Sequence, residues 1–320
     1  MSESPVSWVV GSGGLLGSHV VRALSRRGPV WRWSVPHSWT TPDIDRQLDV
    51  AATKFSVAVV HRPWQVVWCA GAGVTATTEE ALRKEAAVLD VLLGALSTRL
   101  PSGSDGTVFL ASSAGGVYAG AGAPPFTEHT PSAPISPYGE TKVSQEVRAA
   151  VWAAEQGWRL VIGRISNLYG PGQNLGKPQG LISHLCRAAL TRQPISIYVP
   201  LDTIRDYLYA PDCGEFVADA MARARRESPV SDGRVFSKIL ASQHGVTVGA
   251  LLGELRRVHK RSTKVIHGTS TVVRFQARDL RFRSVVWPEL DQRTLTPLPT
   301  GIDATLRDMT SRLQSGSLRA

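Results

Sequence analysis

Short, nearly continuous apolar runs alternate with longer segments of helical periodicity over the first 240 residues of this 320-residue chain. Runs of this kind predict strands that are buried on both faces of a sheet, and their alternation with helices is typical of parallel, doubly wound α/β folds. The expected strands are 6–10, 28–35, a short segment ending at 48–50, 66–70, 107–111, 158–165, 195–199, 204–209 and 235–240. The expected helices are 18–27, 79–96, 213–225, 248–259, one that begins at 137 and a last one from 302.

A glycine-rich turn joins the first expected strand to the first expected helix and contains Gly11, Gly14 and Gly17. Such glycines permit a tight turn and let the backbone approach a pyrophosphate, while the N-terminus of the helix offers free N–H groups to the phosphates. A purely structural turn is the alternative. Because the trio begins five residues after the first strand does, we favour a dinucleotide site on a Rossmann-like sheet.

The end of the second expected strand is the place where enzymes that use NAD normally carry an acid for the adenosine ribose. The residue here is Ser34 or Val35, with Arg32 nearby, and no carboxylate follows before Asp43. A missing acid beside a basic residue permits NADP. The choice between NAD and NADP therefore stays open.

Two further segments end where a cofactor lies in a doubly wound sheet. Asp49 follows a short apolar segment and is a candidate acceptor for the adenine amino group. Ala70 and Gly71 follow a buried run and would let the backbone approach the cofactor. A solvated aspartate and an ordinary turn are the alternatives.

A tyrosine and a lysine stand four residues apart at the start of a long expected helix. Ser136 is suited to cap this helix and Pro137 to occupy its first position. Tyr138 and Lys142 then share one face. A free phenol has a pKa of ~10, so a tyrosine that acts as a base near neutrality needs a cation beside it. Lys142 is placed to be that cation.

A hydroxyl group at the end of the strand at 107–111 is the expected third member of the site. Ser113 precedes Tyr138 by 25 residues and is the preferred candidate, with Ser112 as the alternative. This hydroxyl would hold the substrate oxygen while Tyr138 exchanges its proton.

Charge and cysteine content narrow the chemistry. The chain has 36 Lys and Arg against 26 Asp and Glu, and its net charge of +10 favours an anionic partner: nucleic acid, an acidic surface or a phosphorylated small molecule. Three cysteines without paired spacing support neither a disulfide framework nor a zinc site, so we expect no metal and a reduced, cytoplasmic setting. With no secretory signal and no apolar run of about 18 residues, we expect an unprocessed chain that does not span a membrane.

Together these stretches resemble the extended short-chain dehydrogenase/reductase family, and within it the NAD-dependent epimerase/dehydratase group that acts on nucleotide sugars. The resembling segments are 11–17, 49–50, 112–118, 134–142, 164–173 and 205–207. The resemblance implies that the backbone N–H groups of Leu15 and Leu16 meet the cofactor diphosphate, and that Asp49 and Val50 bind the adenine. It also implies that Lys142 holds the ribose hydroxyls.

The same resemblance assigns the substrate diphosphate to Asn167 and Arg205. Three departures from the family pattern accompany it. The acid after the second strand is absent, Glu85 replaces an asparagine in the helix before the serine strand, and 200–203 replaces a glycine-rich turn. In addition, Ala114 and Gly115 stand where 4,6-dehydratases have an Asp-Glu pair, so we expect no dehydratase chemistry.

The resemblance implies a nucleotide-sugar 4-epimerase that works through a transient 4-keto sugar with NAD or NADP. A 4-ketoreductase that consumes NADPH would use the same residues. A non-catalytic Rossmann protein that binds a cofactor or nucleic acid is a further alternative, but it has no use for the serine, tyrosine and lysine. We therefore expect a nucleotide-diphosphate sugar as partner and no nucleic acid.

The expected organisation is a dinucleotide-binding domain and a smaller C-terminal substrate-binding domain. Residues 1–170 would form the first, with 205–240 returning to it. Residues 171–204 and 241–320 would form the second. Members of the family often pair through two long helices per subunit, which predicts a homodimer.

Overall fold

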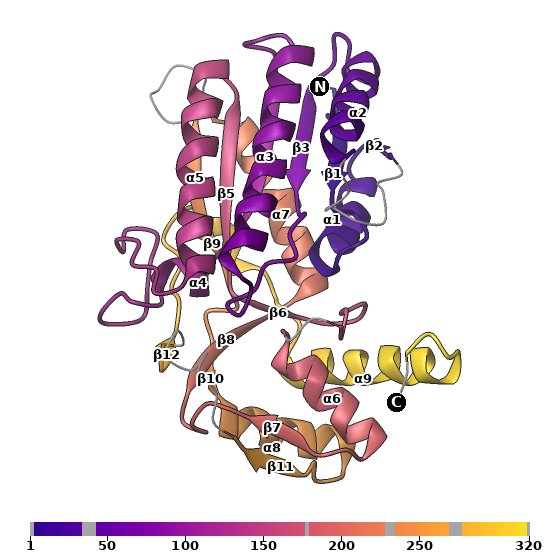
Figure 1. Ribbon diagram of the computed structural model, residues 1–320, viewed down its shortest axis with the longest axis vertical. Coiled ribbons are helices and arrows are strands. Elements are labelled where there is room, and N and C mark those ends of the chain that lie inside the picture. Colours follow the sequence, from indigo (N-terminus) through magenta and orange to yellow (C-terminus); the bar gives the residue numbers. More distant parts are fainter. Residues whose placement is uncertain (1–2, 34–42, 177–178, 228–233, 269–276, 319–320) are drawn as a thin grey trace.

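The computed structural model describes residues 3–33, 43–176, 179–227, 234–268 and 277–318. Its main feature is a six-stranded parallel sheet with the strand order β2-β1-β3-β4-β5-β9 (Figure 1). The strands are β1 (Val6–Val10), β2 (Val30–Trp31), β3 (Trp64–Trp68), β4 (Gly106–Ser113), β5 (Arg159–Ile165) and β9 (Val235–Leu240). The expected Rossmann-like, doubly wound sheet is therefore confirmed.

Both faces of this sheet are covered by helices, which explains why its strands are continuous apolar runs. Alternate residues of a strand point to opposite faces. Trp8 and Val10 pack into one core with α2 (Ile44–Ala58), α3 (Glu79–Arg99) and α5 (Pro137–Gln156). Val9, between them, packs into the other core with α1 (Leu15–Ser25) and α7 (Ala210–Arg225).

A second, smaller part of the chain lies below the carboxyl ends of these strands in Figure 1. Its sheet has the order β10-β8-β12, and β6 pairs with β8. A third core lies among its helices and includes Ile182, Leu251 and Ile302. The remaining elements are α4 (Ala114–Tyr118), β6 (Asn167–Tyr169), α6 (Leu181–Thr191), β7 (Ile195–Ile197), β8 (Ile204–Tyr209), β10 (Gly245–Thr247), α8 (Val248–His259), β11 (Val265–His267), β12 (Asp279–Leu280), η2 (Pro288–Gln292) and α9 (Leu298–Gln314).

One sequence prediction about strands is wrong, and one predicted strand belongs to the smaller sheet. The segment at 48–50 does not end a strand but lies inside α2, where Ile44, Leu48 and Phe55 are buried at helical spacing. A segment of three residues is too short to reveal this period. The strand expected at 204–209 is confirmed as β8, and its described partners are β6, β10 and β12 of the smaller sheet. The helix α7 and the strand β9 do pack with the large sheet, as expected.

The second strand is shorter than expected, since β2 covers only two residues of the predicted 28–35. Ser34 and Val35, the candidates at its end, lie outside the described residues. Within the described part, no helix is both long and apolar enough to cross a bilayer.

Candidate active site

The glycine turn between β1 and α1 packs so tightly that two of its glycines have no room for a side chain. Gly11 has a φ of +87°, and a Cβ there would lie 2.6 Å from the backbone nitrogen of Ala70. A Cβ on Gly17 would lie 2.1 Å from the carbonyl oxygen of Gly11. Gly14 precedes α1 without a capping side chain, so the first N–H groups of the helix, at Leu15 and Leu16, are available to an anion. This geometry fits the diphosphate of a dinucleotide.

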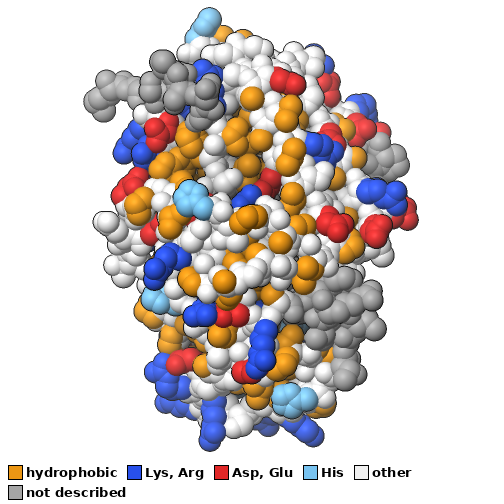
Figure 2. Space-filling view, turned by 90° about the vertical axis from the view of Figure 1, so that its left-hand side faces the viewer, with side chains coloured by type: hydrophobic (Ala, Val, Ile, Leu, Met, Phe, Trp, Pro, Cys, Tyr) orange, Lys and Arg blue, Asp and Glu red, His pale blue; other side chains and the backbone are white. Residues whose placement is uncertain are grey.

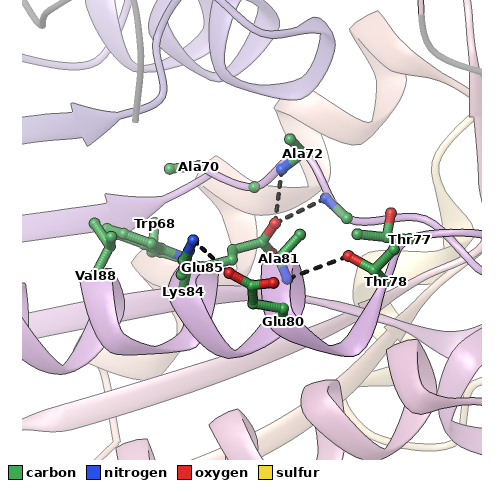
Figure 3. Close-up of a pocket in the computed structure, with 12 residues that line it drawn as sticks. Trp68, Ala70, Ala72, Thr77, Thr78, Glu80, Ala81, Lys84, Glu85 and Val88 are labelled. Carbon is green, nitrogen blue, oxygen red and sulfur yellow. Dashed lines mark hydrogen bonds and ion pairs between the residues drawn. The ribbon is translucent and has the colours of Figure 1, made fainter. Parts of the chain in front are cut away.

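A second turn, after β3, lies directly beside the glycine turn. The N–H groups of Ala72 and Gly73 donate to Glu85 Oε2 of α3 at 2.8 Å and 2.7 Å (Figure 3). Gly71 has a φ of +150°, and a Cβ there would lie 2.8 Å from Glu85 Oε1. A cavity of about 360 Å³ opens between this turn, from Ala70 onward, and the first turns of α3. The structure thus brings Ala70 and Gly71 next to Gly11, as expected of a cofactor site.

Tyr138 is held at the start of the long helix α5 by contacts with the short helix α4. Ser136 Oγ accepts a hydrogen bond of 3.1 Å from Gly139 N, and Pro137 is the first helical residue, as predicted. A Cβ on Gly139 would lie 2.3 Å from the carbonyl oxygen of Gly116 in α4. A Cβ on Gly116 would lie 3.1 Å from Cε1 of Tyr138. The tyrosine ring therefore packs directly on the backbone of α4.

Ser113 contacts the same short helix, α4. It caps α4, and its Oγ accepts a hydrogen bond of 3.1 Å from Gly116 N. Ser113 and Tyr138 therefore both contact Gly116, the serine through its hydroxyl and the tyrosine through its ring. Ser112 is buried and donates instead to Glu146 Oε1 at 2.5 Å. Of the two serines, Ser113 is the one placed beside the tyrosine.

Lys142 is buried one turn further along α5. Its Nζ lies 5.7 Å from the ring centroid of Tyr138. It donates to Gln145 Oε1 at 3.1 Å and to Glu85 Oε1 at 3.4 Å. The structure therefore brings together the three side chains that the sequence singled out, Ser113, Tyr138 and Lys142.

A buried ion pair joins α5 to β5 near these residues. Arg164 of β5 donates to both carboxylate oxygens of Glu146 and to the hydroxyl of Tyr118. Burial opposes the charge of Arg164, but the hydrogen bonds and charge of Glu146 prevail and raise its pKa. Burial raises the pKa of Tyr118, so this phenol stays protonated. The sequence analysis missed Glu146, although its position one turn after Lys142 places it on the same helix face.

The two residues expected to bind substrate lie on neighbouring strands. Asn167 of β6 is exposed, and its Nδ2 donates to the carbonyl oxygen of Asp206 at 2.9 Å. Arg205 of β8 is mostly buried, with Nη1 2.8 Å from the carbonyl oxygen of Ile204, and burial lowers its pKa. Asn167 pairs in register with Tyr207, two residues from Arg205. Their part in binding a diphosphate stays a prediction.

Asp49 and Val50 are not placed as expected for an adenine site. Asp49 lies in α2 and not at a strand end, and Arg99 from the end of α3 donates to both of its carboxylate oxygens at 2.8–2.9 Å. Val50 is exposed on the same helix. Among the described residues, no group of three His, Cys, Asp or Glu side chains is arranged to hold a metal ion.

Comparison with known proteins agrees with this site. The family model for the NAD dependent epimerase/dehydratase family matches residues 8–234. The UDP-glucose 4-epimerase of Azospirillum brasilense is 31% identical in an alignment of 252 residues that covers 70% of this chain and 70% of its own. The UDP-glucose 4-epimerase of Thermotoga maritima, solved with UDP-glucose, has a TM-score of 0.76 at 20% identity and covers 96% of this chain and 99% of its own.

A third similar protein was solved with a different cofactor. The structure of RMD from Pseudomonas aeruginosa, complexed with NADPH, has a TM-score of 0.75 at 21% identity and covers 98% of this chain and 100% of its own. At such identities the structural likeness concerns the fold. The family model, by contrast, covers most of the chain and includes the glycine turn, Ser113, Tyr138 and Lys142. The chain therefore belongs to the NAD-dependent epimerase/dehydratase family.

Proposed function

We propose that this protein is an NAD(P)-dependent nucleotide-sugar 4-epimerase. The observation that carries the proposal is that Ser113 and Tyr138 both contact Gly116, while Lys142 Nζ lies 5.7 Å from the ring centroid of Tyr138, at the same edge of the sheet as the glycine turn. The relative named UDP-glucose 4-epimerase, similar over most of both chains, supports the sugar nucleotide as substrate class.

The three side chains divide the proton chemistry between them. Tyr138, as a phenolate, takes the proton of the sugar 4-hydroxyl and later returns it. Ser113 donates a hydrogen bond to the same oxygen, and Lys142 stabilises the phenolate and contacts the ribose hydroxyls of the cofactor. A bound nicotinamide would accept the hydride of C4 and give it back. Return of the hydride to the opposite face of the 4-keto sugar would invert the configuration at C4.

The cofactor and substrate are both anions, and the site offers a separate group to each. The N-terminus of α1 binds the dinucleotide diphosphate, through Leu15 and Leu16. Asn167 and Arg205 bind the diphosphate of the sugar nucleotide, with the arginine as the stronger contact. Replacing Arg205 with Lys should raise KM for the sugar nucleotide at least about tenfold, because a bidentate contact is lost. An unchanged KM would remove Arg205 from the substrate site.

A direct test uses candidate nucleotide sugars, beginning with UDP-glucose. A 4-epimerase converts the sugar without a net change in nicotinamide absorbance at 340 nm. Product formation is followed by chromatography of the released sugars. If none of the nucleotide sugars tested is converted at C4, the proposal fails.

A 4-ketoreductase is the second candidate, favoured by one observation. Arg32, just after β2, is exposed, and no acid lies among the described residues at that strand end, a combination that suits the 2′-phosphate of NADPH. A reductase would consume NADPH with a 4-keto sugar nucleotide. Native mass spectrometry of the purified protein would identify the bound dinucleotide by its mass.

We also propose a homodimer in a reduced, cytoplasmic setting. Figure 2 shows the side of the molecule that carries α5, where hydrophobic side chains gather in the upper half between charged ones. Val147 and Val151, one turn apart on α5, are more than half exposed and would form part of the interface. Burial raises the pKa of the Cys69 and Cys213 thiols, in keeping with unreactive, reduced cysteines.

A further inference from the structure

A carboxylate lies against the lysine that is proposed to activate Tyr138. Glu85 and Lys142 come from different helices, α3 and α5, and form an ion pair of 3.4 Å. Their side chains are only 13% and 8% exposed. Water and salt screen such a pair far less than a surface pair. The charge of Glu85 therefore acts on Lys142 almost undiminished.

The carboxylate is fixed in this position by the turn after β3. Its Oε2 accepts the N–H groups of both Ala72 and Gly73 (Figure 3). Its Oε1 accepts a hydrogen bond from Lys142 Nζ. Two backbone donors on one oxygen hold the side chain in a single orientation. The glycine at position 71 leaves the space that Oε1 occupies.

The other charged groups near Lys142 are already compensated. On α5 itself, Glu146 is paired with Arg164 of β5 at 2.6 Å. Tyr118 of α4 is hydrogen-bonded to the same arginine. The neighbouring part of β4 contributes only Ser112 and Ser113, and the Glu80–Lys84 pair of α3 is exposed to solvent. Glu85 is thus the charge that competes with Tyr138 for the lysine.

We propose that Glu85 is a positioning residue that shares Lys142 with Tyr138 and so shifts phenolate formation toward alkaline pH. The inference rests on the proposed roles of Tyr138 and Lys142. An anion beside the pair disfavours the phenolate directly and also neutralises the ammonium group that would stabilise it. Loss of the Glu85 charge should therefore favour the phenolate.

The test is a spectroscopic titration of Tyr138. Phenolate absorbance at 295 nm is measured against pH without dinucleotide, and the curve of the Tyr138→Phe form of each protein is subtracted. The quantity compared is the Tyr138 midpoint of each variant relative to that of the wild-type protein. In Glu85→Gln it should fall by about one unit. Glu85→Asp keeps the charge and should stay close to the wild type.

The matched control is Asp90→Asn. Asp90 and Arg148 form another ion pair between α3 and α5, but its side chains are 43% and 40% exposed. Its removal should leave the Tyr138 titration unchanged. In turnover assays at saturating dinucleotide, the acid limb of the kcat/KM profile of Glu85→Gln should move to lower pH by the same amount as the titration.

The inference is overturned if Glu85→Gln titrates like the wild type. It is also overturned if Tyr138 in the wild-type protein already titrates about two units below a free tyrosine, a result that decides the matter even where Glu85→Gln does not fold. Because the titration needs neither cofactor nor substrate, its outcome is independent of whether the protein is an epimerase. Turnover of Tyr138→Phe tests that question separately.

Discussion

Tyr138 is the residue on which the proposed chemistry depends most. Replacing it with Phe removes the proton acceptor but keeps the ring that packs on Gly116. We expect turnover of the sugar nucleotide to fall about a hundred- to ten-thousand-fold, while dinucleotide binding persists. Tyr198→Phe is the control, since Tyr198 is half exposed in the smaller part of the chain. Full activity in Tyr138→Phe would refute the assignment.

The two adjacent serines should respond oppositely to replacement by Ala. Ser113→Ala removes the hydroxyl beside Tyr138 and should lower turnover with little effect on unfolding by urea. Ser112→Ala leaves the buried Glu146 short of one donor and should reduce the free energy of unfolding by about 1–3 kcal/mol. Equal effects of the two changes on turnover would contradict a catalytic role for Ser113 and a structural role for Ser112.

The glycine turn is the element whose shape the cofactor site requires. Gly17 lies in α1, and inside a helix Ala is normally more stabilising than Gly by about 0.5–1 kcal/mol. Any loss of stability in Gly17→Ala therefore reports the clash between the new Cβ and the carbonyl oxygen of Gly11. We expect a loss of about 1–3 kcal/mol and at least tenfold weaker dinucleotide binding, by calorimetry. Gly13→Ala is the matched control, because nothing lies within 4 Å of its Cβ. If Gly17→Ala and Gly13→Ala bind the dinucleotide with equal affinity, the turn is not the diphosphate site.

Elements with a strong local pattern could be predicted from the sequence, and elements defined by distant contacts could not. The strands β1, β3, β4, β5 and β9 are confirmed because burial on both faces leaves continuous apolar runs. The helix α5 is confirmed because Ser136 and Pro137 mark its start locally. The helix α2 was missed around Asp49, and the pairing of β8 with β6, β10 and β12 has no local signature.

The same distinction holds for the candidate site. Ser113, Tyr138 and Lys142 were identifiable because each follows a strand end or a helix cap. The contact between Glu85 and Lys142 spans 57 positions of the sequence, and the one between Ser112 and Glu146 spans 34. Such contacts arise only when the sheet brings α3, β4 and α5 together. The residues that tune the site were therefore the part that sequence patterns missed.

At the scale of the whole molecule, assembly is the property that the outer face of α5 predicts. Val147 and Val151 are 58% and 54% exposed, and α3 packs beside this helix, so two copies could bury both helices against each other. We expect light scattering to give the mass of two 34.5 kDa chains. The double change Val147→Lys and Val151→Lys should give one, because four lysines would face each other across the interface.

A control substitution of a valine on another helix distinguishes loss of the interface from a general effect of added surface charge. Val57 is 71% exposed, more than either valine of α5, and it lies on α2, which is not one of the two helices proposed for the interface. Val57→Lys should therefore keep the mass of two chains and the turnover of the wild type. A wild-type mass of one chain would show that the protein does not pair. A dimer that persists in the double variant would show that the interface does not include this face of α5. Since Glu85 and Lys142 join the inner sides of the same two helices, the double variant should also show whether pairing stabilises the active site. Only if it does should the turnover of the wild type fall with dilution and that of the double variant be low at every concentration.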